Sequence, residues 1–308
     1  MALLEVKDLK VHFPIHGGIL GRVVGHVKAV DGVSFTIEPG QTIGLVGESG
    51  SGKSTIGKTI LGLTHITSGS IYFDGKNITR SVRKNRSPYR KSVQMIFQDV
   101  YSSLNPRKRV LDIIAEPIRN FEKLTKGEER KRVDELLGIV GLSPDNANKY
   151  PFEFSGGQRQ RIGVARAIAL KPKLIVADEP VSALDLSVQA QVLNHLKDIQ
   201  QELGLAYLFI SHDLGVVRHM CEHLAIMHHA RFVEFGTRQD IYENAQHIYT
   251  QRLIAAIPDT DPKMRHANAR RRADIAAAYE QALHTYYKDG HDVYDLRPIS
   301  PTHQVAMI

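Results

Sequence analysis

The chain has 308 residues, of which 42% are hydrophobic and 24% charged, a balance typical of a globular protein with a sizeable core. Its single cysteine, Cys221, excludes a disulfide framework within the chain, and no apolar run approaches the ~18 residues of a membrane span. The net charge of +7 comes from basic residues spread along the chain, which favours solvated surface over a nucleic-acid or lipid patch. We therefore expect one large domain with an appendage, in the cytosol or bound to a membrane through a partner.

The first half of the chain is predicted to mix short strands with one helix. Apolar runs indicate strands at 3–13, 29–37, 42–46, 70–73 and 91–97, and a helical pattern occupies 56–63. A glycine-rich hairpin or loop joins the first two strands. The last run ends at Gln98, and the segment 101–106, Tyr-Ser-Ser-Leu-Asn-Pro, then breaks the pattern.

The second half is predicted to begin with a small helical subdomain. Apolar residues recur at spacings of three and four from 110 to 140, as they do on one face of a helix. After it we expect a helix that ends near 170, a buried strand at 174–177, a helix at 187–203 and a strand at 206–210. The tail from 236 onward is predicted to be helical and more polar.

A glycine-rich turn lies between the buried strand at 42–46 and the helix that follows. It has the pattern G-x-x-x-x-G-K-[ST] and consists of Gly47, Glu48, Ser49, Gly50, Ser51, Gly52, Lys53, Ser54 and Thr55. Glycines let backbone amides curl toward a phosphate chain, and the helix start presents unpaired N–H groups. Lys53 would then reach the β- and γ-phosphates, and Ser54 would hold Mg²⁺. A flexible Gly/Ser loop is the alternative, but Lys-Ser-Thr at a strand-to-helix junction favours nucleotide binding.

Three further strand ends carry polar residues that suit nucleotide hydrolysis. Asp178 can hold Mg²⁺ through water or through Ser54, and Glu179 adds a carboxylate that can polarise an attacking water. Gln98 can sense Mg²⁺ and the water through its amide, or it is a solvated loop glutamine. His212 can donate a hydrogen bond to the γ-phosphate, although one histidine among 15 is more often structural.

A second histidine group is a weaker metal candidate. His219 and His223 stand at i, i+4 on a predicted helix, with Cys221 and Glu222 between them. Cys221 would point to a different helix face and no third ligand is evident, so a structural or surface role is favoured.

The order of these motifs resembles that of ATP-binding-cassette (ABC) ATPases. The segment 154–161, Phe-Ser-Gly-Gly-Gln-Arg-Gln-Arg, looks like their signature motif, and 182–185, Ser-Ala-Leu-Asp, follows the acidic pair as in the family. The resemblance covers about residues 3–240. It implies that Gln98 is the Q-loop glutamine, Glu179 the catalytic base, Asp185 part of the D-loop and His212 the switch histidine. It also puts Phe13 where the family stacks an aromatic ring on adenine, the alternative being a strand-end core residue.

The signature motif has its own physical interpretation. Gly156 and Gly157 let amides at a helix N-terminus approach a γ-phosphate, Ser155 adds a hydroxyl, and Gln158 completes the motif. In the family this motif faces the nucleotide of the opposite subunit, so the resemblance implies that two cassettes close on two ATP molecules. That closure is the two-state element which ATP binding and hydrolysis would drive.

The implied fold is α/β, a RecA-like P-loop NTPase core with an antiparallel β subdomain and an inserted helical subdomain at about 99–153. The ATPase domain would span 1–240, and a helical C-terminal appendage would span 241–308. Phe97-Gln98-Asp99, the segment 103–107, His247, Tyr249-Thr250 and the segment 255–258 resemble ATPase subunits of oligopeptide and dipeptide importers. Val100 and Ile248 depart from that pattern, which usually has proline at both positions, and nickel and glutathione importers share the tail.

The resemblance implies a peripheral ATPase at the cytoplasmic face of the cell membrane that uses ATP and Mg²⁺. Its partners would be two transmembrane permease subunits, docked through the helical subdomain, a sister ATPase in a heterodimer, and an extracytoplasmic peptide-binding protein, without nucleic acid. A soluble cassette ATPase that acts on DNA or ribosomes is the alternative. That class needs long coiled-coil heptads or two cassettes in one chain, and this sequence has neither. A GTPase is disfavoured because no Asn-Lys-x-Asp motif follows the glycine-rich turn.

Overall fold

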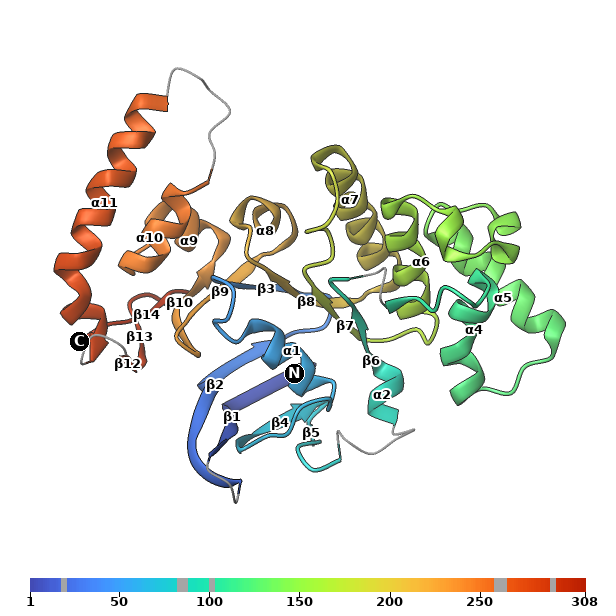
Figure 1. Ribbon diagram of the computed structural model, residues 1–308, viewed down its shortest axis with the longest axis horizontal. Helices are drawn as coiled ribbons and strands as arrows, with labels where there is room; N and C mark the ends of the chain where they lie inside the picture. Colours follow the sequence, from blue (N-terminus) through green and yellow to red (C-terminus); the bar gives the residue numbers. More distant parts are fainter. Residues whose placement is uncertain (18–20, 82–87, 100–102, 258–264, 289–291) are drawn as a thin grey trace.

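The computed structural model describes residues 1–17, 21–81, 88–99, 103–257, 265–288 and 292–308. An eight-stranded sheet forms the centre of the molecule, with a smaller antiparallel sheet below it in Figure 1. The helical subdomain and the C-terminal extension lie at opposite ends of the large sheet (Figure 1). Among the described helices, none has an apolar stretch long enough to cross a membrane.

The large sheet contains the buried strands that the sequence predicted. Its members are β3 (Thr42–Val46), β6 (Val93–Ile96), β7 (Leu174–Asp178), β8 (Ala206–Ser211), β9 (His223–His228), β10 (Arg231–Thr237), β13 (Leu296–Pro298) and β14 (Gln304–Ala306). They are ordered β13-β14-β10-β9-β3-β8-β7-β6, and the five from β9 to β6 are parallel. Strands β3, β7 and β8 are buried at every residue, which explains their continuous apolar sequence.

The small sheet forms the antiparallel β subdomain. It consists of β1 (Leu4–Gly17), β2 (Arg22–Ile37), β4 (Ser68–Phe73) and β5 (Lys76–Asn77), in the order β2-β1-β4-β5. The first two strands are longer than the sequence pattern indicated, because their far ends form an exposed two-stranded ribbon without a buried face. Helix α1 (Lys53–Ile60) lies between this sheet and the large one, and α2 (Pro88–Ser92) precedes β6.

The helical subdomain follows the predicted pattern of spacings. It contains α4 (Val110–Phe121), α5 (Lys126–Ile139) and the short 3-10 helices η1 (Pro144–Asn148) and η2 (Pro151–Glu153). Thr125 and Glu128 form a capping box that starts α5. The predicted apolar face is buried, except that Leu111 is only partly covered. Helices α6 (Gly156–Ile168), α7 (Leu186–Leu203) and α8 (Leu214–Met220) then cover the large sheet.

The C-terminal extension is helical as predicted but also contains strands. Its helices are α9 (Arg238–Asn244), α10 (Ile248–Ala255) and α11 (Arg265–Tyr286), and β11 (Tyr287–Lys288) pairs with β12 (Asp292–Val293). Strands β13 and β14 join the edge of the large sheet through β10. Strands of two or three residues are too short to leave a periodic signal, so these strands were not predicted. Tyr249, Tyr287 and Val293 lie in the same hydrophobic cluster as residues of the large sheet and of the helical subdomain.

The predicted helix that would carry both His219 and His223 is wrong. Helix α8 ends at Met220, and His223 begins β9, where it pairs with Ile43 of the central strand. The two histidines are therefore not on one helix face. Cys221 is buried, and burial raises the pKa of its thiol. Within the described part of the chain, no group of three His, Cys, Asp or Glu side chains is arranged to hold a metal.

Candidate nucleotide site

Four parallel strands end at one edge of the large sheet and bring the predicted site residues together. Strands β3, β8, β7 and β6 are neighbours in that order. Val46 pairs with Ser211, and Asp178 pairs with Ile210, so the strand ends are level. The residues that follow each strand therefore meet at the carboxyl edge, where α/β sheets bind ligands.

The glycine-rich turn is packed so tightly at two positions that only glycine fits. A Cβ atom at Gly52 would lie 2.0 Å from the carbonyl oxygen of Ala29, and one at Gly47 would lie 2.1 Å from that of Met227. Gly52 also has φ +110°, a backbone conformation that L side chains rarely adopt. Gly50 differs, since a Cβ atom there would meet no atom of the described residues within 4 Å. The loop is therefore packed between β2 and the end of β9 at Gly52 and Gly47, whereas the turn at Gly50 is not packed against another element.

Lys53 is folded onto the loop itself. Its Nζ donates to the carbonyl oxygens of Gly47 and Glu48, at 2.7 Å each, and to Ser51 Oγ at 3.3 Å. The side chain is almost fully buried, and burial lowers the pKa of Lys53 against the opposing effect of nearby carboxylates, chiefly Glu179 and Asp178. The ammonium thus stands at the start of α1, beside the loop that would surround a phosphate chain.

Ser54 and Asp178 form a pair of oxygen donors. Ser54 Oγ donates to Asp178 Oδ1 at 2.8 Å, across 124 residues of sequence. Asp178 is 5% exposed, and burial raises the pKa of its carboxyl group. A hydroxyl and a carboxylate are the hard oxygen ligands that Mg²⁺ prefers, so this pair fits the predicted metal.

Glu179 is held by both of the other predicted catalytic residues. Gln98 Nε2 donates to Glu179 Oε2, and His212 Nδ1 lies on Glu179 Oε1, both at 2.9 Å. Glu179 has φ +47°, which is unusual for a residue with a Cβ atom and marks local backbone strain. Such strain concentrates at functional sites, and here it aims the carboxylate at the cleft between the strand ends. No local sequence pattern signals this conformation.

Most of these residues line one cleft of about 580 Å³, whereas Gly47, Ser51 and Asp178 are not among its lining residues. From the predicted set it includes Glu48, Ser49, Gly50, Gly52, Lys53, Ser54, Thr55, Gln98, Glu179 and His212. Ala29 of β2 and Leu253 of α10 also line it, and neither residue carries a sequence signal for this role. Phe13 lies on β1 opposite Val27 and is 45% exposed, outside the set of residues that line this cleft.

The signature segment does not line this cleft, although Gly156 lines a smaller neighbouring cavity that shares Gln98 with it. Ser155 caps α6 through a reciprocal pair of hydrogen bonds with Gln158. Ser155 and Gly156 are exposed, and no residue of 155–158 is among those that line the cleft. A Cβ atom at Gly157 would lie 2.6 Å from Val188 Cγ1 of α7, so this glycine is also required by packing within the chain. Asp185 is exposed at the N-cap of α7 without a capping bond from its side chain.

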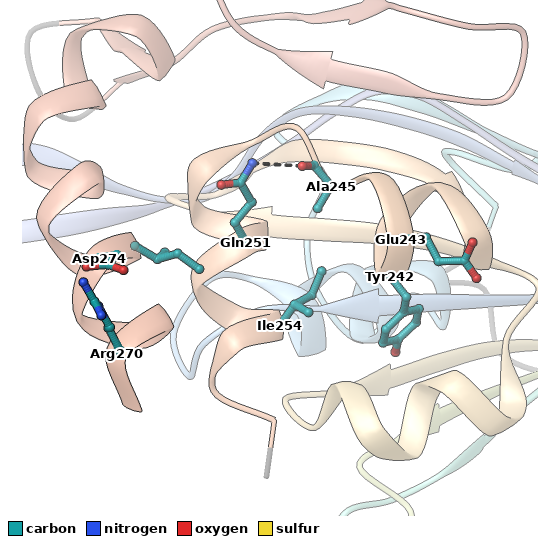
Figure 2. A pocket seen from close by; sticks show the side chains of 8 residues that line it. Tyr242, Glu243, Ala245, Gln251, Ile254, Arg270 and Asp274 are labelled. Carbon is teal, nitrogen blue, oxygen red and sulfur yellow. Dashed lines mark hydrogen bonds between the residues drawn. The ribbon is translucent and has the colours of Figure 1, made fainter. Parts of the chain in front are cut away.

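A second depression lies in the extension, away from the strand ends (Figure 2). It has a volume of about 530 Å³ between α9, α10 and α11. Figure 2 shows Gln251 of α10 with its amide bonded to the carbonyl oxygen of Ala245, at 2.9 Å. Arg270, Asp274 and Glu243 give its lining charges of both signs, which favours no single class of ligand.

Two protein families and many individual proteins are similar to this chain. The family described as "ABC transporter" matches residues 30–182, and that described as "Oligopeptide/dipeptide transporter, C-terminal region" matches 233–285. The oligopeptide transport ATP-binding protein OppF of Lactococcus lactis subsp. lactis is 58% identical over 99% of this chain and 96% of its own length. The glutathione import ATP-binding protein GsiA of Pectobacterium atrosepticum is 48% identical over 85% of this chain and 42% of its own. A solved dimeric ATP-binding cassette in a post-hydrolysis state, bound to ADP and Pi, is 27% identical with a TM-score of 0.66, covering 76% of this chain and 98% of its own.

Proposed function

This chain belongs to the ABC transporter family as an ATP-binding subunit, and from that membership we propose that it hydrolyses ATP to energise uptake of oligopeptides across the cell membrane. The peptide assignment is supported by the match of 233–285 to the peptide-transporter C-terminal region and by the near full-length similarity to OppF. The ATPase assignment is supported by one observation above all. Gln98 and His212 are each hydrogen-bonded to Glu179, and all three line the cleft that contains Lys53.

We assign Glu179 the role of general base. Its carboxylate would take a proton from the water that attacks the γ-phosphate. Gln98 and His212 each bond one of its oxygens, so they orient the carboxylate and would move with it when nucleotide enters. His212 is half exposed toward the cleft and can turn to donate to the γ-phosphate.

The glycine-rich loop, residues 47–55, would bind the phosphate chain of ATP. Lys53 would leave the carbonyl oxygens of Gly47 and Glu48 for the β- and γ-phosphates, because a phosphate is a stronger acceptor for an ammonium than a neutral carbonyl. Ser54, Asp178 and the amide oxygen of Gln98 would hold Mg²⁺. When bound, Mg²⁺ neutralises charge on the β- and γ-phosphate oxygens. Phe13 remains a proposed stacking partner of adenine.

The working unit in this proposal is a pair of cassettes. The exposed Ser155, Gly156 and Asp185 would face the nucleotide of a second cassette together with the half-buried Gly157, and Gln158 would cap the helix behind them. The dimeric relative bound to ADP and Pi supports this arrangement. We propose a heterodimer with a sister ATPase, at the cytoplasmic face, bound to two transmembrane permease subunits that receive peptide from an extracytoplasmic binding protein.

Docking on the permease subunits would use the helical subdomain. We propose that the segment 101–105, which follows Gln98, contacts the permease subunits; Tyr101 and Ser102 lie outside the described residues. Within the rest of it, Asn105 is exposed, whereas Leu104 is 1% exposed and packs inside the subdomain. Arg166 of α6 donates to the carbonyl oxygen of Ser103 at 2.6 Å, so the segment is tied to the signature helix. Movement of α6 can therefore reach the docking surface.

Glutathione is the second candidate substrate, because GsiA relatives are 46–48% identical. This chain covers 96% of OppF but only 42% of GsiA from Pectobacterium, so peptides are favoured.

Uptake in a strain that lacks this chain tests the proposal. Uptake of radiolabelled di- to oligopeptides should be lost and restored by the parent chain, while free amino acids enter normally. Undiminished peptide uptake, in a strain without a redundant system, would contradict the peptide assignment. Loss of labelled glutathione uptake instead would identify the second candidate.

A further inference from the structure

We infer that α10 of the C-terminal extension is a wall of the nucleotide site and that Tyr249 is a positioning residue for the glycine-rich loop. This inference rests on the proposed nucleotide binding. It assigns the extension a part in ATP affinity, beyond any part in assembly of the transporter.

A continuous path of hydrogen bonds leads from Tyr249 to Lys53. The backbone N–H of Glu48 donates to the hydroxyl of Tyr249 at 3.0 Å, although the two residues are 201 positions apart. The carbonyl oxygen of the same Glu48 accepts from Lys53 Nζ at 2.7 Å. The peptide groups on both sides of Glu48 are therefore fixed, one by the extension and the other by the lysine that would contact the phosphates. Removing the hydroxyl of Tyr249 would therefore affect the position of Lys53 through Glu48 alone.

Tyr249 is itself held without freedom to move. It is fully buried, and its ring stacks on that of His228, with centroids 4.0 Å apart and planes 22° apart. His228 Nδ1 lies 2.8 Å from the hydroxyl of Tyr287, and His247 Nδ1 accepts from the backbone N–H of Tyr249 at 3.1 Å. We call these four residues, His228, His247, Tyr249 and Tyr287, the junction. Because its rings are packed against one another, the tyrosine hydroxyl is presented at a fixed position.

Two more residues lie on the same face of α10 as Tyr249 and are close to the glycine-rich loop or the cleft. Arg252 and Leu253 follow Tyr249 at i+3 and i+4, so all three share one side of the helix. Leu253 lines the nucleotide cleft, and an Arg252 guanidinium nitrogen lies 3.6 Å from Glu48 Oε1. Gln251 and Ile254 belong to the depression on the other side of α10 (Figure 2). The helix therefore stands between the loop and the rest of the extension.

The consequence is a coupling between nucleotide and extension. If the loop geometry that binds phosphate is the one that Tyr249 stabilises, then bound nucleotide must stabilise the position of α10 by the same factor. Removing the tyrosine hydroxyl leaves the Glu48 N–H facing an apolar ring edge, which weakens the loop geometry without touching Glu179.

The test compares Tyr249→Phe with Tyr286→Phe in the full-length chain. Tyr286 supplies a matched control, because its hydroxyl also bonds a backbone group, the carbonyl oxygen of Gln246 at 3.0 Å, but within the extension. A fluorescent ATP analogue should bind about fivefold more weakly to Tyr249→Phe than to the parent, and with parental affinity to Tyr286→Phe. In the assembled transporter, KM for ATP should rise by a similar factor with kcat within about twofold of the parent.

Hydrogen exchange provides a readout that a purely structural role would not change. ATP should slow exchange at 248–255 in the parent and much less in Tyr249→Phe. Parental affinity in Tyr249→Phe, or an equal loss in both variants, would overturn the inference. A parent that binds no ATP, or Lys53→Ala that binds as tightly as the parent, would overturn the proposed function first and this inference with it.

Discussion

The nucleotide cleft and the junction lie on two sides of Glu48 and place their polar groups in opposite environments. In the cleft, Glu179 and His212 face a cavity of about 580 Å³, where substrate can reach them. In the junction, Tyr249 and Tyr287 are at most 2% exposed and bond partners inside the protein. Polar groups that bond one another in a packed interior fix a geometry, whereas groups at a cavity can change partners. The cleft is thus suited to chemistry and the junction to holding the cleft in shape.

A change in the cleft, Glu179→Gln, should have the largest effect on ATP turnover. The amide cannot accept the proton of the attacking water, so turnover should fall by about 10³-fold while ATP affinity stays near the parental value. The closed, ATP-loaded pair should accumulate and be visible as added mass in size-exclusion runs with Mg-ATP. Lys53→Ala is the contrasting variant, since it should lose both ATP affinity and turnover. Turnover near the parental rate in Glu179→Gln would exclude this residue as the base.

Gly52→Ala tests the side of the glycine-rich loop that packs against β2. Its effect on ATP affinity should be the next largest. The new methyl would clash with the carbonyl oxygen of Ala29, so β2 or the loop must move, and ATP affinity should fall by more than about tenfold. Gly50→Ala is the control, because its Cβ meets open space and only its φ of +82° is unfavourable. It should weaken binding by less than Gly52→Ala in the same titration. Equal effects would mean that backbone conformation, not packing on β2, makes glycine necessary.

Acid should destabilise the folded protein through the buried histidines of the junction, His228 and His247. Burial lowers the pKa of His228 and of His247 from 6.5 to about 3, so the folded protein keeps both rings neutral. As pH falls from about 6.5 toward about 3, the unfolded chain takes up protons that the fold excludes, and stability is lost. For His247 alone the loss between pH 8 and pH 5 is roughly 2 kcal/mol.

His247→Asn isolates this contribution. Asparagine keeps a capping oxygen at the start of α10 but removes the titrating ring. In urea unfolding, the drop in stability from pH 8 to pH 5 should be smaller in the variant by roughly 2 kcal/mol. Glu234 contributes with the opposite sign, because burial raises its pKa, but it is present in both proteins and cancels in the difference. Identical pH dependence in the two proteins would mean that His247 is not held neutral.

Much of the cleft could be predicted because each of its parts has a local pattern. The loop at 47–55, the strand ends before Gln98, Asp178 and His212, and the capped helix after Ser155 are all signalled within a few residues. The sequence of the C-terminal extension predicted less about the contacts that its residues make. His247 and Tyr249 stood out as a motif, but no local pattern indicated that the tyrosine hydroxyl bonds the loop. The helix predicted around His223 was wrong because pairing with β3 favours a strand there.

The sequence by itself determined the glycine-rich loop, the buried parallel strands and the order of the catalytic residues, because turn chemistry and apolar periodicity are properties of neighbouring residues. The tertiary structure alone decided which distant groups meet. It brought His212 and Gln98 onto opposite oxygens of Glu179, fixed the left-handed backbone of Glu179, and packed Gly157 against α7. It also added β13 and β14 to the large sheet and placed Tyr249 on Glu48. Those contacts depend on how whole elements pack, and packing between residues up to 201 positions apart leaves no trace in any local pattern.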